Sequence, residues 1–429
     1  MKQFFKHIIV AILRAEARLL LARTHPKIIA ITGSVGKTST KDAVYAVLKH
    51  HVHARKSEKS FNSDVGVPLS ILGLPNAWSN PLGWLQNIID GLVIALTVRE
   101  YPEWLVLEVG VDRPGDMAAI ARWLKPDIVV LTRLPDMPVH VEYFASPEDV
   151  AAEKLELVKA LSPEGVLVYN HDDERVRAVA EGLRQRSVGF SRYSLSDFTA
   201  SADKVVYEDG RAAGIECTLT HAGEAVVVRV QGSLGVQHAY NYAAAAAVGS
   251  LLGVSIADAA AALAEHLPPA GRMRLIDGIK GTLIIDDTYN SSPVALERSL
   301  ATLKEVKGAT RKIAVLGDML ELGQFSVLAH LTAGEQASQS ADILMTVGVR
   351  ARGIAKGALN AGMDEAKIFQ YEDEARAGKE LELMLMTGDV VLVKGSQSVR
   401  LERVVEEIMA EPEEAPELLV RQDPIWKKM

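Results

Sequence analysis

The chain has 429 residues, of which 48% are hydrophobic and 24% charged, and its formal net charge is −8. This length allows two or three domains with their own cores, and the ordinary composition indicates a soluble globular protein. The acidic balance argues against a nucleic-acid partner. A single cysteine, Cys217, excludes disulfides within the chain and cysteine-rich metal sites. We therefore expect a cytoplasmic protein.

Residues 1–26 are expected to form an N-terminal amphipathic helix. Arg14, Glu16 and Arg18 interrupt the apolar run over residues 8–21, so this run cannot span a bilayer. The basic residues would allow residues 4–23 to lie on a membrane surface. Apolar stripes of this kind usually pack within the protein, and we favour that interpretation. A second apolar segment, residues 82–96, is also too short to span a bilayer and is a candidate packing partner.

Residues 28–40 have the pattern of a buried strand, a glycine-containing loop and a helix. The loop ends in Gly36-Lys37-Thr38. Loops of this type bind polyphosphate, because their N–H groups and the positive end of the helix dipole face the ligand. Lys37 would reach the outer phosphates, and the Thr38 hydroxyl would hold Mg²⁺. The pattern predicts ATP or GTP binding. Gly33 makes the loop tighter than usual, and the alternative is a strand–helix turn that binds nothing.

The rest of the chain up to residue 268 completes a predicted central α/β domain, residues 27–268. Apolar strands alternate with helical patterns as far as residue 190, which is typical of a mainly parallel sheet. Between residues 197 and 232 the pattern changes, and a turn at 221–224 predicts a hairpin in a small antiparallel sheet. The predicted strands are 104–108, 127–132 and 166–169, and the predicted helices are 117–124, 147–161, 173–183, 241–252 and 256–266.

A Pro-rich linker at 268–271 precedes a second predicted α/β domain, residues 269–410. Its pattern is that of a doubly wound, Rossmann-like sheet with ligands at the carboxyl ends of the strands. Its predicted strands are 283–285, 313–316, 343–347 and 390–393. Residues 411–429 are acidic and contain proline, so we expect a flexible tail.

Polar residues follow several of the predicted strands. Glu108 ends one, and a charged residue at the end of a parallel strand points to the ligand crevice, where a carboxylate is a suitable Mg²⁺ ligand. Arg272 follows the linker and could reach a phosphate across a domain cleft. Asp287 and Lys394 also follow strands, as part of a binding edge. By itself, His140 would be interpreted as structural.

These motifs together resemble the Mur ligase family, ATP-dependent amide-forming enzymes of peptidoglycan synthesis. The resemblance extends over residues 27–408, and it is strongest to the branch that adds D-Ala-D-Ala to a UDP-muramoyl tripeptide. The motifs that carry it are residues 32–38, 61–68, 108–110, 170–173, 286–293, 316–323 and 394–396.

The resemblance assigns roles to individual residues. The implied catalytic residues are Lys37, Glu108, His140, Lys154 and Arg272. The implied ATP contacts are Gly33, Ser34, Val35, Gly36, Lys37, Thr38, Ser39, Asn241, Arg272 and Asp287. Two Mg²⁺ ions would be held by Thr38, Glu108, His140 and a carbamylated Lys154. The implied substrate contacts are Asn62, Asn290, Lys394 and Ser396.

The implied reaction activates a carboxylate of a UDP-muramoyl peptide as an acyl phosphate, which the amine of D-Ala-D-Ala then attacks. We expect a monomer. The sequence departs from the family in two ways. Residues 1–26 are too few for the family's UDP-binding domain, which concerns recognition of the substrate. Arg133, Gln237-His238 and Gln397 also stand where the family usually has other residues. The alternatives are a related ligase with another acid and amine, such as a folylpolyglutamate-like enzyme, a regulatory P-loop ATPase, and a member without catalysis. The joint presence of the implied catalytic residues disfavours the last two.

Overall fold

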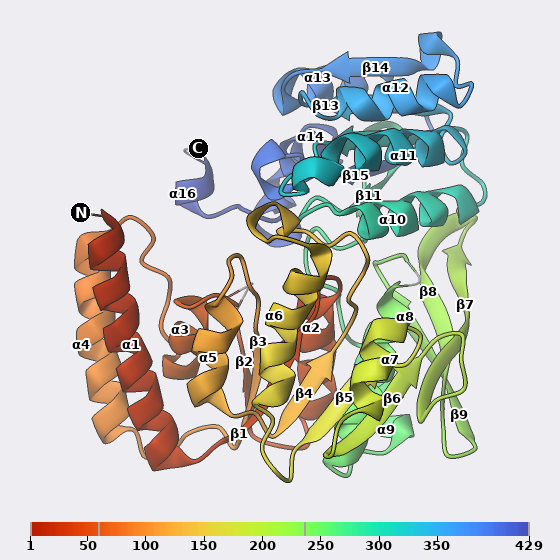
Figure 1. Cartoon of the computed structure of the whole chain (residues 1–429). Helices are drawn as coiled ribbons and strands as arrows, with labels where there is room; N and C mark the ends of the chain where they lie inside the picture. The colour runs from red at the N-terminus through yellow and green to blue at the C-terminus, as the bar shows by residue number, and fades with distance from the viewer. Residues whose placement is uncertain (1, 59–60, 236, 428–429) are drawn as a thin grey trace.

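The computed structural model describes residues 2–58, 61–235 and 237–427, and it arranges them around two β-sheets (Figure 1). The first sheet has nine strands in the order β2-β3-β1-β4-β5-β6-β7-β8-β9, and the second has six in the order β10-β11-β15-β12-β13-β14. The two sheets correspond to the two α/β domains expected from the sequence, so the predicted fold class is confirmed.

The first six strands of the larger sheet are parallel, and β1 lies near their centre. Ile29 and Ile31 of β1 face one core, whereas Ile28 and Ala30 face the other. Because helices cover both faces, the strand reads as a continuous apolar run. These strands are β1 (Lys27–Thr32), β2 (Ala54–Lys56), β3 (Trp104–Glu108), β4 (Ile128–Leu131), β5 (Val166–Asn170) and β6 (Arg186–Ser191).

The remaining strands of this sheet are β7 (Phe198–Glu208), β8 (Arg211–His221) and β9 (Glu224–Gln231), which pair antiparallel. The expected hairpin is present: Ala222 and Gly223 both have positive φ, as a tight two-residue turn requires. These strands extend the parallel sheet beyond β6, because β7 pairs with β6 through Phe190 and Ser191.

The helices of this half are α1 (Lys2–Thr24), α2 (Lys37–Leu48), α3 (Gly66–Leu72), α4 (Pro81–Thr97), α5 (Asp116–Leu124), α6 (Pro147–Lys159), α7 (Glu174–Glu181), α8 (Gln237–Leu251) and α9 (Ile256–Ala264). α1 packs against α3 and α4, as the favoured interpretation of residues 4–23 and 82–96 predicted. The α1–α4 pair lies at one edge of the molecule (Figure 1). Within the described part of the chain, none of the helices has the length and apolarity to cross a membrane.

The second sheet is parallel except for its edge strand β10. Side chains of α10, α11 and α12 form the core on one face, and those of α13 and α14 form the core on the other. The strands are β10 (Arg274–Asp277), β11 (Leu283–Asp286), β12 (Lys312–Gly317), β13 (Ile343–Val347), β14 (Ile368–Tyr371) and β15 (Val390–Lys394). The helices are α10 (Pro293–Glu305), α11 (Ser326–Ser338), α12 (Arg352–Asn360), α13 (Glu374–Met384) and α14 (Glu402–Ile408).

The C-terminal segment differs from the expected flexible tail. It contains α15 (Ala415–Leu418) and α16 (Pro424–Lys427), and Ala415 and Leu419 are buried in the core beside α13 and α14. Arg421 forms a buried ion pair with Glu402, with 2.8 Å between Nη2 and Oε2. The acidic residues that suggested a flexible tail lie on the exposed side of this segment, and its few apolar residues hold the segment against the second domain.

Candidate functional site

The predicted phosphate loop connects β1 to α2 and depends on two glycines. A Cβ at Gly33 would lie 2.0 Å from Thr132 Oγ1, and Gly33 and Gly36 have φ of 136° and 86°. Other residues rarely adopt these angles. Thr132 Oγ1 donates to the Val35 carbonyl at 2.8 Å. Thr132, which directly follows β4, therefore fixes the loop against the sheet.

Lys37 and Thr38 begin α2. The Lys37 ammonium donates to the Gly33 carbonyl at 3.0 Å, so its side chain curls over the loop. Burial lowers the pKa of Lys37, and the negative charge of Glu108 opposes that shift. The Thr38 hydroxyl lies 3.5 Å from the Arg272 guanidinium, which comes from the other side of the cleft. The loop and the second domain thus meet at this point.

Glu108 ends β3 beside the loop and is 1% exposed. Its Oε1 accepts a hydrogen bond from Asn62 Nδ2 at 2.8 Å. Its Oε2 is buried and has no hydrogen-bond partner among the described residues. A buried carboxylate oxygen without a partner is costly, and a hard cation such as Mg²⁺ would satisfy it. The site therefore fits Mg²⁺ at Glu108.

Lys154 lies on α6 and is 2% exposed. Burial, followed by the positive charge of Lys37, lowers the pKa of Lys154 to about 7, and the charge of Asp112 opposes the shift. The neighbouring Glu153 accepts from the backbone N–H groups of Gly115 and Met117, which ties α6 to the start of α5. Because of its lowered pKa, about half of the Lys154 side chain is a neutral amine at pH 7.

His140 lies in the loop after β4 with a left-handed backbone, φ 70°. Its Nδ1 is 2.6 Å from Glu321 Oε2, and its Nε2 is 3.8 Å from Asp112 Oδ1. The hydrogen bond from His140 lowers the pKa of Glu321. Because Glu321 follows β12, this pair joins the two domains across the cleft.

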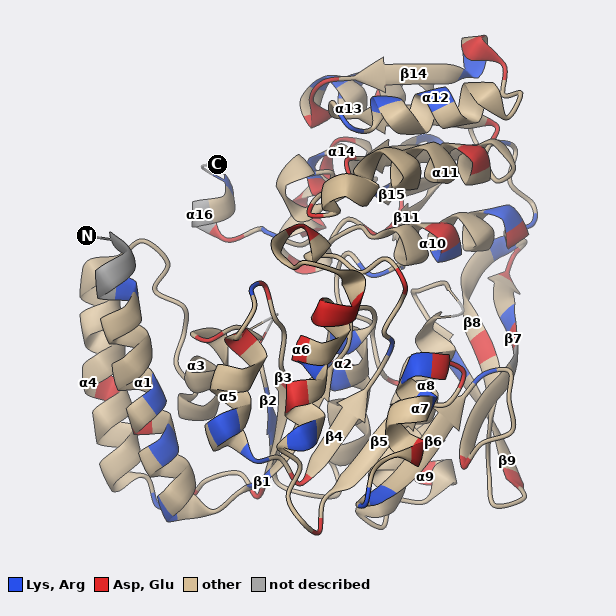
Figure 2. Cartoon of the chain, viewed as in Figure 1, with Lys and Arg blue, Asp and Glu red and all other residues tan. Residues whose placement is uncertain are grey.

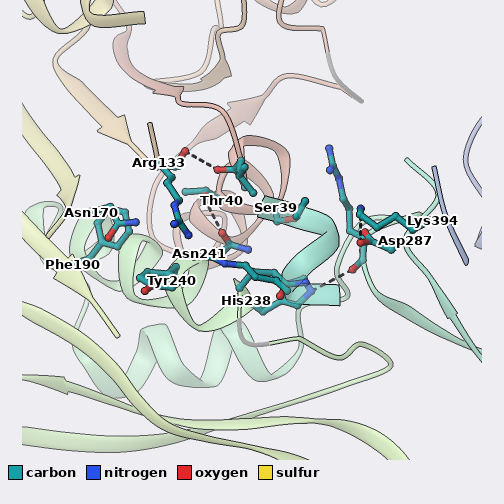
Figure 3. A pocket seen from close by; sticks show the side chains of 17 residues that line it. Ser39, Thr40, Arg133, Asn170, Phe190, His238, Tyr240, Asn241, Asp287 and Lys394 are labelled. Atoms are coloured by element: carbon teal, nitrogen blue, oxygen red, sulfur yellow. Dashed lines mark hydrogen bonds and ion pairs between the residues drawn. The ribbon is translucent and has the colours of Figure 1, made fainter. Parts of the chain in front are cut away.

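The second domain contributes a buried ion pair. Lys394 Nζ, at the end of β15, lies 2.6 Å from Asp287 Oδ2 and 2.9 Å from the Asn290 carbonyl. Asp287 also accepts from the Ser299 hydroxyl at 2.7 Å. Burial lowers the pKa of Lys394, and the charge of Asp287 opposes this. Figure 3 shows this pair at the pocket, on the opposite side from Asn170 and Phe190.

Asn241 lies on α8 and is buried. Its Oδ1 accepts from the Thr40 hydroxyl at 3.0 Å, a contact drawn in Figure 3. Arg272 stacks on Tyr289, with 4.0 Å between the guanidinium carbon and the ring centroid. The stacking aims Arg272 toward Thr38.

Two cavities adjoin these residues. The smaller, of ≈ 60 Å³, is lined from both domains, among others by Gly36, Ser39, Arg133, Asn241, Arg272, Asp287 and Lys394. The larger, of ≈ 560 Å³, is lined among others by Asp112, Arg113, His140, Asn290, Glu321, Ser396 and Trp426. The implied substrate residues are thus divided: Asn290 and Ser396 line the larger cavity, Lys394 lines the smaller one, and Asn62 supports Glu108.

Some site residues were not assigned from the sequence. Glu321 pairs with His140 and lies inside the motif 316–323, so the motif was found but the partner was not. Arg113 stacks on Tyr143, with 3.4 Å from its guanidinium carbon to the ring centroid. Asp112 acts on the pKa values of Lys37 and Lys154. It follows the motif 108–110 by two residues, and that proximity was the available signal.

Comparison with known proteins agrees with this geometry. The model of the Mur ligase middle domain matches residues 31–249, and that of the Mur ligase, glutamate ligase domain matches residues 271–397. A UDP-N-acetylmuramoyl-tripeptide–D-alanyl-D-alanine ligase of Bacillus subtilis (strain 168) is 28% identical over 404 residues, which are 93% of this chain and 79% of the relative. Its namesake from Mycobacterium leprae (strain TN) is 32% identical over 396 residues, 87% of this chain and 72% of the relative.

Among solved structures, MurF ligase from Thermotoga maritima in complex with ADP is similar, with a TM-score of 0.77 and 27% identity. The match covers 95% of this chain and 84% of that one. The family models, the relatives and the fold agree, and they confirm the resemblance drawn from the motifs. The chain belongs to the Mur ligase family.

Proposed function

We propose that this chain, an ATP-dependent and ADP-forming peptide ligase, joins D-Ala-D-Ala to a UDP-muramoyl tripeptide in peptidoglycan precursor synthesis. The relatives named above carry that activity in their names. The observation that best supports it is the position of Glu108. Its Oε2, which has no hydrogen-bond partner among the described residues, lies close enough to Lys37 of the phosphate loop for its charge to act on that lysine.

The nucleotide would bind at the loop 33–39, with Asn241 on the base side and Arg272 and Asp287 approaching from the second domain. Ligand pockets usually measure about 300–1,000 Å³, whereas the cavity at this place measures ≈ 60 Å³. We propose that the lining groups move apart when the nucleotide binds. Lys37 would exchange its bond with the Gly33 carbonyl for the outer phosphates, and Arg272 would move away from Thr38.

We propose that Thr38 and Glu108 hold one Mg²⁺ and that His140 and a carbamylated Lys154 hold a second. Bound Mg²⁺ would offset the charge that develops on the transferred phosphoryl group. A carbamate forms when a neutral amine adds to CO₂ and releases one proton. Lys154 suits this reaction, because its pKa of about 7 leaves about half of the side chain as the neutral amine at pH 7. In its present contacts His140 pairs with Glu321, so metal binding would compete with that pair.

The residues of the chain would carry the two chemical steps as follows. A substrate carboxylate oxygen attacks the γ-phosphorus of ATP, and the bond to ADP breaks. Lys37 and Arg272 stabilise the charge on the phosphoryl oxygens. The neutral amine then attacks the acyl carbon, phosphate leaves, and the amine loses a proton. Closure of the domains would keep water from the acyl phosphate.

The larger cavity is the proposed place for the peptide end of the substrate and the incoming dipeptide. It lies between the two domains and includes Asn290, Ser396 and His140. Arg113, stacked on Tyr143, adds a cation suited to a carboxylate. Lys394 and Asn62 would act by positioning Asp287 and Glu108. We propose the division into residues 1–26, 27–268, 269–410 and 411–429 as functional units of a cytoplasmic monomer.

The test supplies purified chain with ATP, Mg²⁺, UDP-muramoyl tripeptide and D-Ala-D-Ala, and follows phosphate and the product mass. We expect phosphate release that requires both substrates and a product heavier by one dipeptide less water. Phosphate release that is indifferent to both substrates would contradict the proposal. Glu108→Gln is the matched variant, because it can keep a hydrogen bond with Asn62 and loses the charge that would bind Mg²⁺.

A further inference from the structure

Helix α4 exposes an unusual apolar face. Six large aliphatic side chains recur on one side of the helix, and each is 48–76% exposed. They are Leu82, Leu85, Ile89, Leu92, Val93 and Leu96. Gln86 and Thr97 are the exposed polar residues of this helix, and its one charged residue, Asp90, is half-buried. Contiguous exposed apolar patches on a protein mark interaction sites.

The neighbouring helix α1 supplies positive charge. Its sequence holds five basic residues and one acidic residue, Glu16, which is buried. Lys6, Arg18 and Arg23 are exposed. Figure 2 shows this contrast, with blue segments of ribbon along α1 beside the mostly tan α4. The chain as a whole is acidic, with a net charge of −8, so this basic row is a local feature of the helix pair.

The helix pair is fixed as one unit. Arg23 donates to the carbonyls of Leu96 and Val98, which closes the C-terminal end of α4 onto α1. A Cβ at Gly91 would lie 2.3 Å from the Glu16 carboxylate, so the two helices approach closely at this position. Because α4 is held in this way, its apolar face is a permanent surface.

We propose that this face docks onto an anionic lipid bilayer, with α4 in the interface plane and the basic residues of α1 near the lipid phosphates. Amphipathic helices with an apolar side and flanking Lys or Arg bind membranes in this manner. From the sequence, such contact was an alternative for residues 4–23, and packing within the protein was favoured. The structure assigns the apolar part of the surface to α4, with Ile8 and Leu19 of α1 as smaller contributors.

A second copy of the chain is a weaker match for this face. A helix of 17 residues is about 25 Å long and about 10 Å wide, which gives a footprint of roughly 250 Å². Stable interfaces bury about 800 Å² on each partner. A second copy would also bring the same basic helix rather than a complementary charge. An anionic bilayer matches both the apolar strip and the basic row.

The experiment is vesicle flotation of the full chain, with phosphatidylcholine alone and with phosphatidylcholine mixed with phosphatidylglycerol. We expect the chain to float with the anionic vesicles and to be released by high salt. Ile89→Asp and Leu92→Asp should each lower the bound fraction roughly tenfold. Leu383→Asp, the same change at a 78% exposed leucine of α13, should have no effect. Arg18→Glu should remove the preference for anionic lipid.

Three results would overturn the proposal. The full chain could fail to float with either vesicle, or Ile89→Asp could float as well as the unchanged chain. Alternatively, size-exclusion chromatography with light scattering could show a dimer that Ile89→Asp converts to monomer, which would make the face an interface between copies. Phosphate release in solution is measured separately and does not depend on α4, so failure here leaves the proposed ligase function standing.

Discussion

In most proteins charged side chains are exposed and large apolar side chains are buried. The cleft between the domains breaks the first half of this rule, and the outer face of α4 breaks the second. In the cleft, charged groups are buried: Glu108, Lys154 and Lys394 are 1–2% exposed. On α4, large apolar side chains are exposed. Burying a charge and exposing an apolar surface both cost free energy. Folds tolerate such violations mainly at functional sites, so the two regions together indicate where this molecule acts.

The largest expected effect tests the half-buried charge of Lys37, which contacts the phosphate loop. Lys37→Ala removes the cation that would meet the transferred phosphoryl group, and we expect the rate of ADP formation to fall about 10³-fold. Lys49→Ala, an exposed lysine just past the end of the same helix, is the control and should keep the full rate. If Lys37→Ala formed ADP at the unchanged rate, the charged cleft would not be the catalytic region of this comparison.

The second prediction concerns the ion pair in the second domain. Lys394→Met leaves Asp287 buried without its cation, and we expect the free energy of unfolding to fall by about 3 kcal/mol. Urea titration measures it. Lys159→Met breaks the exposed pair with Glu156 and should cost less than about 0.5 kcal/mol. If both variants lowered the free energy of unfolding equally, burial would not increase the contribution of the Lys394–Asp287 pair to stability.

The third prediction uses the pKa of Lys154, which burial lowers to about 7. About half of the side chain is then neutral at pH 7 and about a tenth at pH 6, so carbamate formation should rise between these values. With bicarbonate present, we expect the ¹³C signal of a lysine carbamate to follow this rise and to vanish in Lys154→Ala. That variant should form ADP about 10²-fold more slowly. A signal that is absent at pH 8 would exclude the carbamate.

The sequence predicted more of the sheets than of the contacts. β3 and β13 match their predicted ranges, because continuous apolar runs bounded by polar residues define buried strands. β2 and β14 were missed, because each has three or four partly exposed residues with little pattern. The phosphate loop was predicted from local residues alone. The His140–Glu321 and Lys394–Asp287 pairs were not, since each depends on how distant segments fold together.

The family resemblance supplied roles for His140 and Lys154 that their sequence neighbourhoods do not carry. The structure adds a physical basis for Lys154, whose burial beside Lys37 makes a neutral amine favourable. The face of α4 was hidden for another reason. An apolar stripe has the same sequence whether it faces a core or solvent, and α4 was expected only to pack against α1. It does pack there, and it also carries a second apolar face.

The smallest effect tests the buried acid inside the helix pair. Burial raises the pKa of Glu16 to about 7 from an ordinary value near 4.5. The folded chain keeps this proton up to about pH 7, whereas the unfolded chain loses it near pH 4.5, so this group makes stability fall as pH rises between those values. Glu16→Gln removes the penalty. We expect its melting temperature to equal that of the unchanged chain at pH 4.5 and to exceed it by about 2 °C at pH 8.

Arg18→Gln, at an exposed position of the same helix, is the control, and its melting temperature should not depend on pH in this way. If Glu16→Gln changes nothing at pH 8, the carboxylate is hydrated and the contact between α1 and α4 is looser than the close approach at Gly91 implies. Vesicle flotation of Glu16→Gln then tests whether the helix pair is rigid. If the helix pair is rigid, it presents its apolar face at every pH, and Glu16→Gln should float as the unchanged chain does. If the pair loosens when Glu16 ionises, the unchanged chain would lose lipid binding above pH 7. Glu16→Gln would then restore that binding.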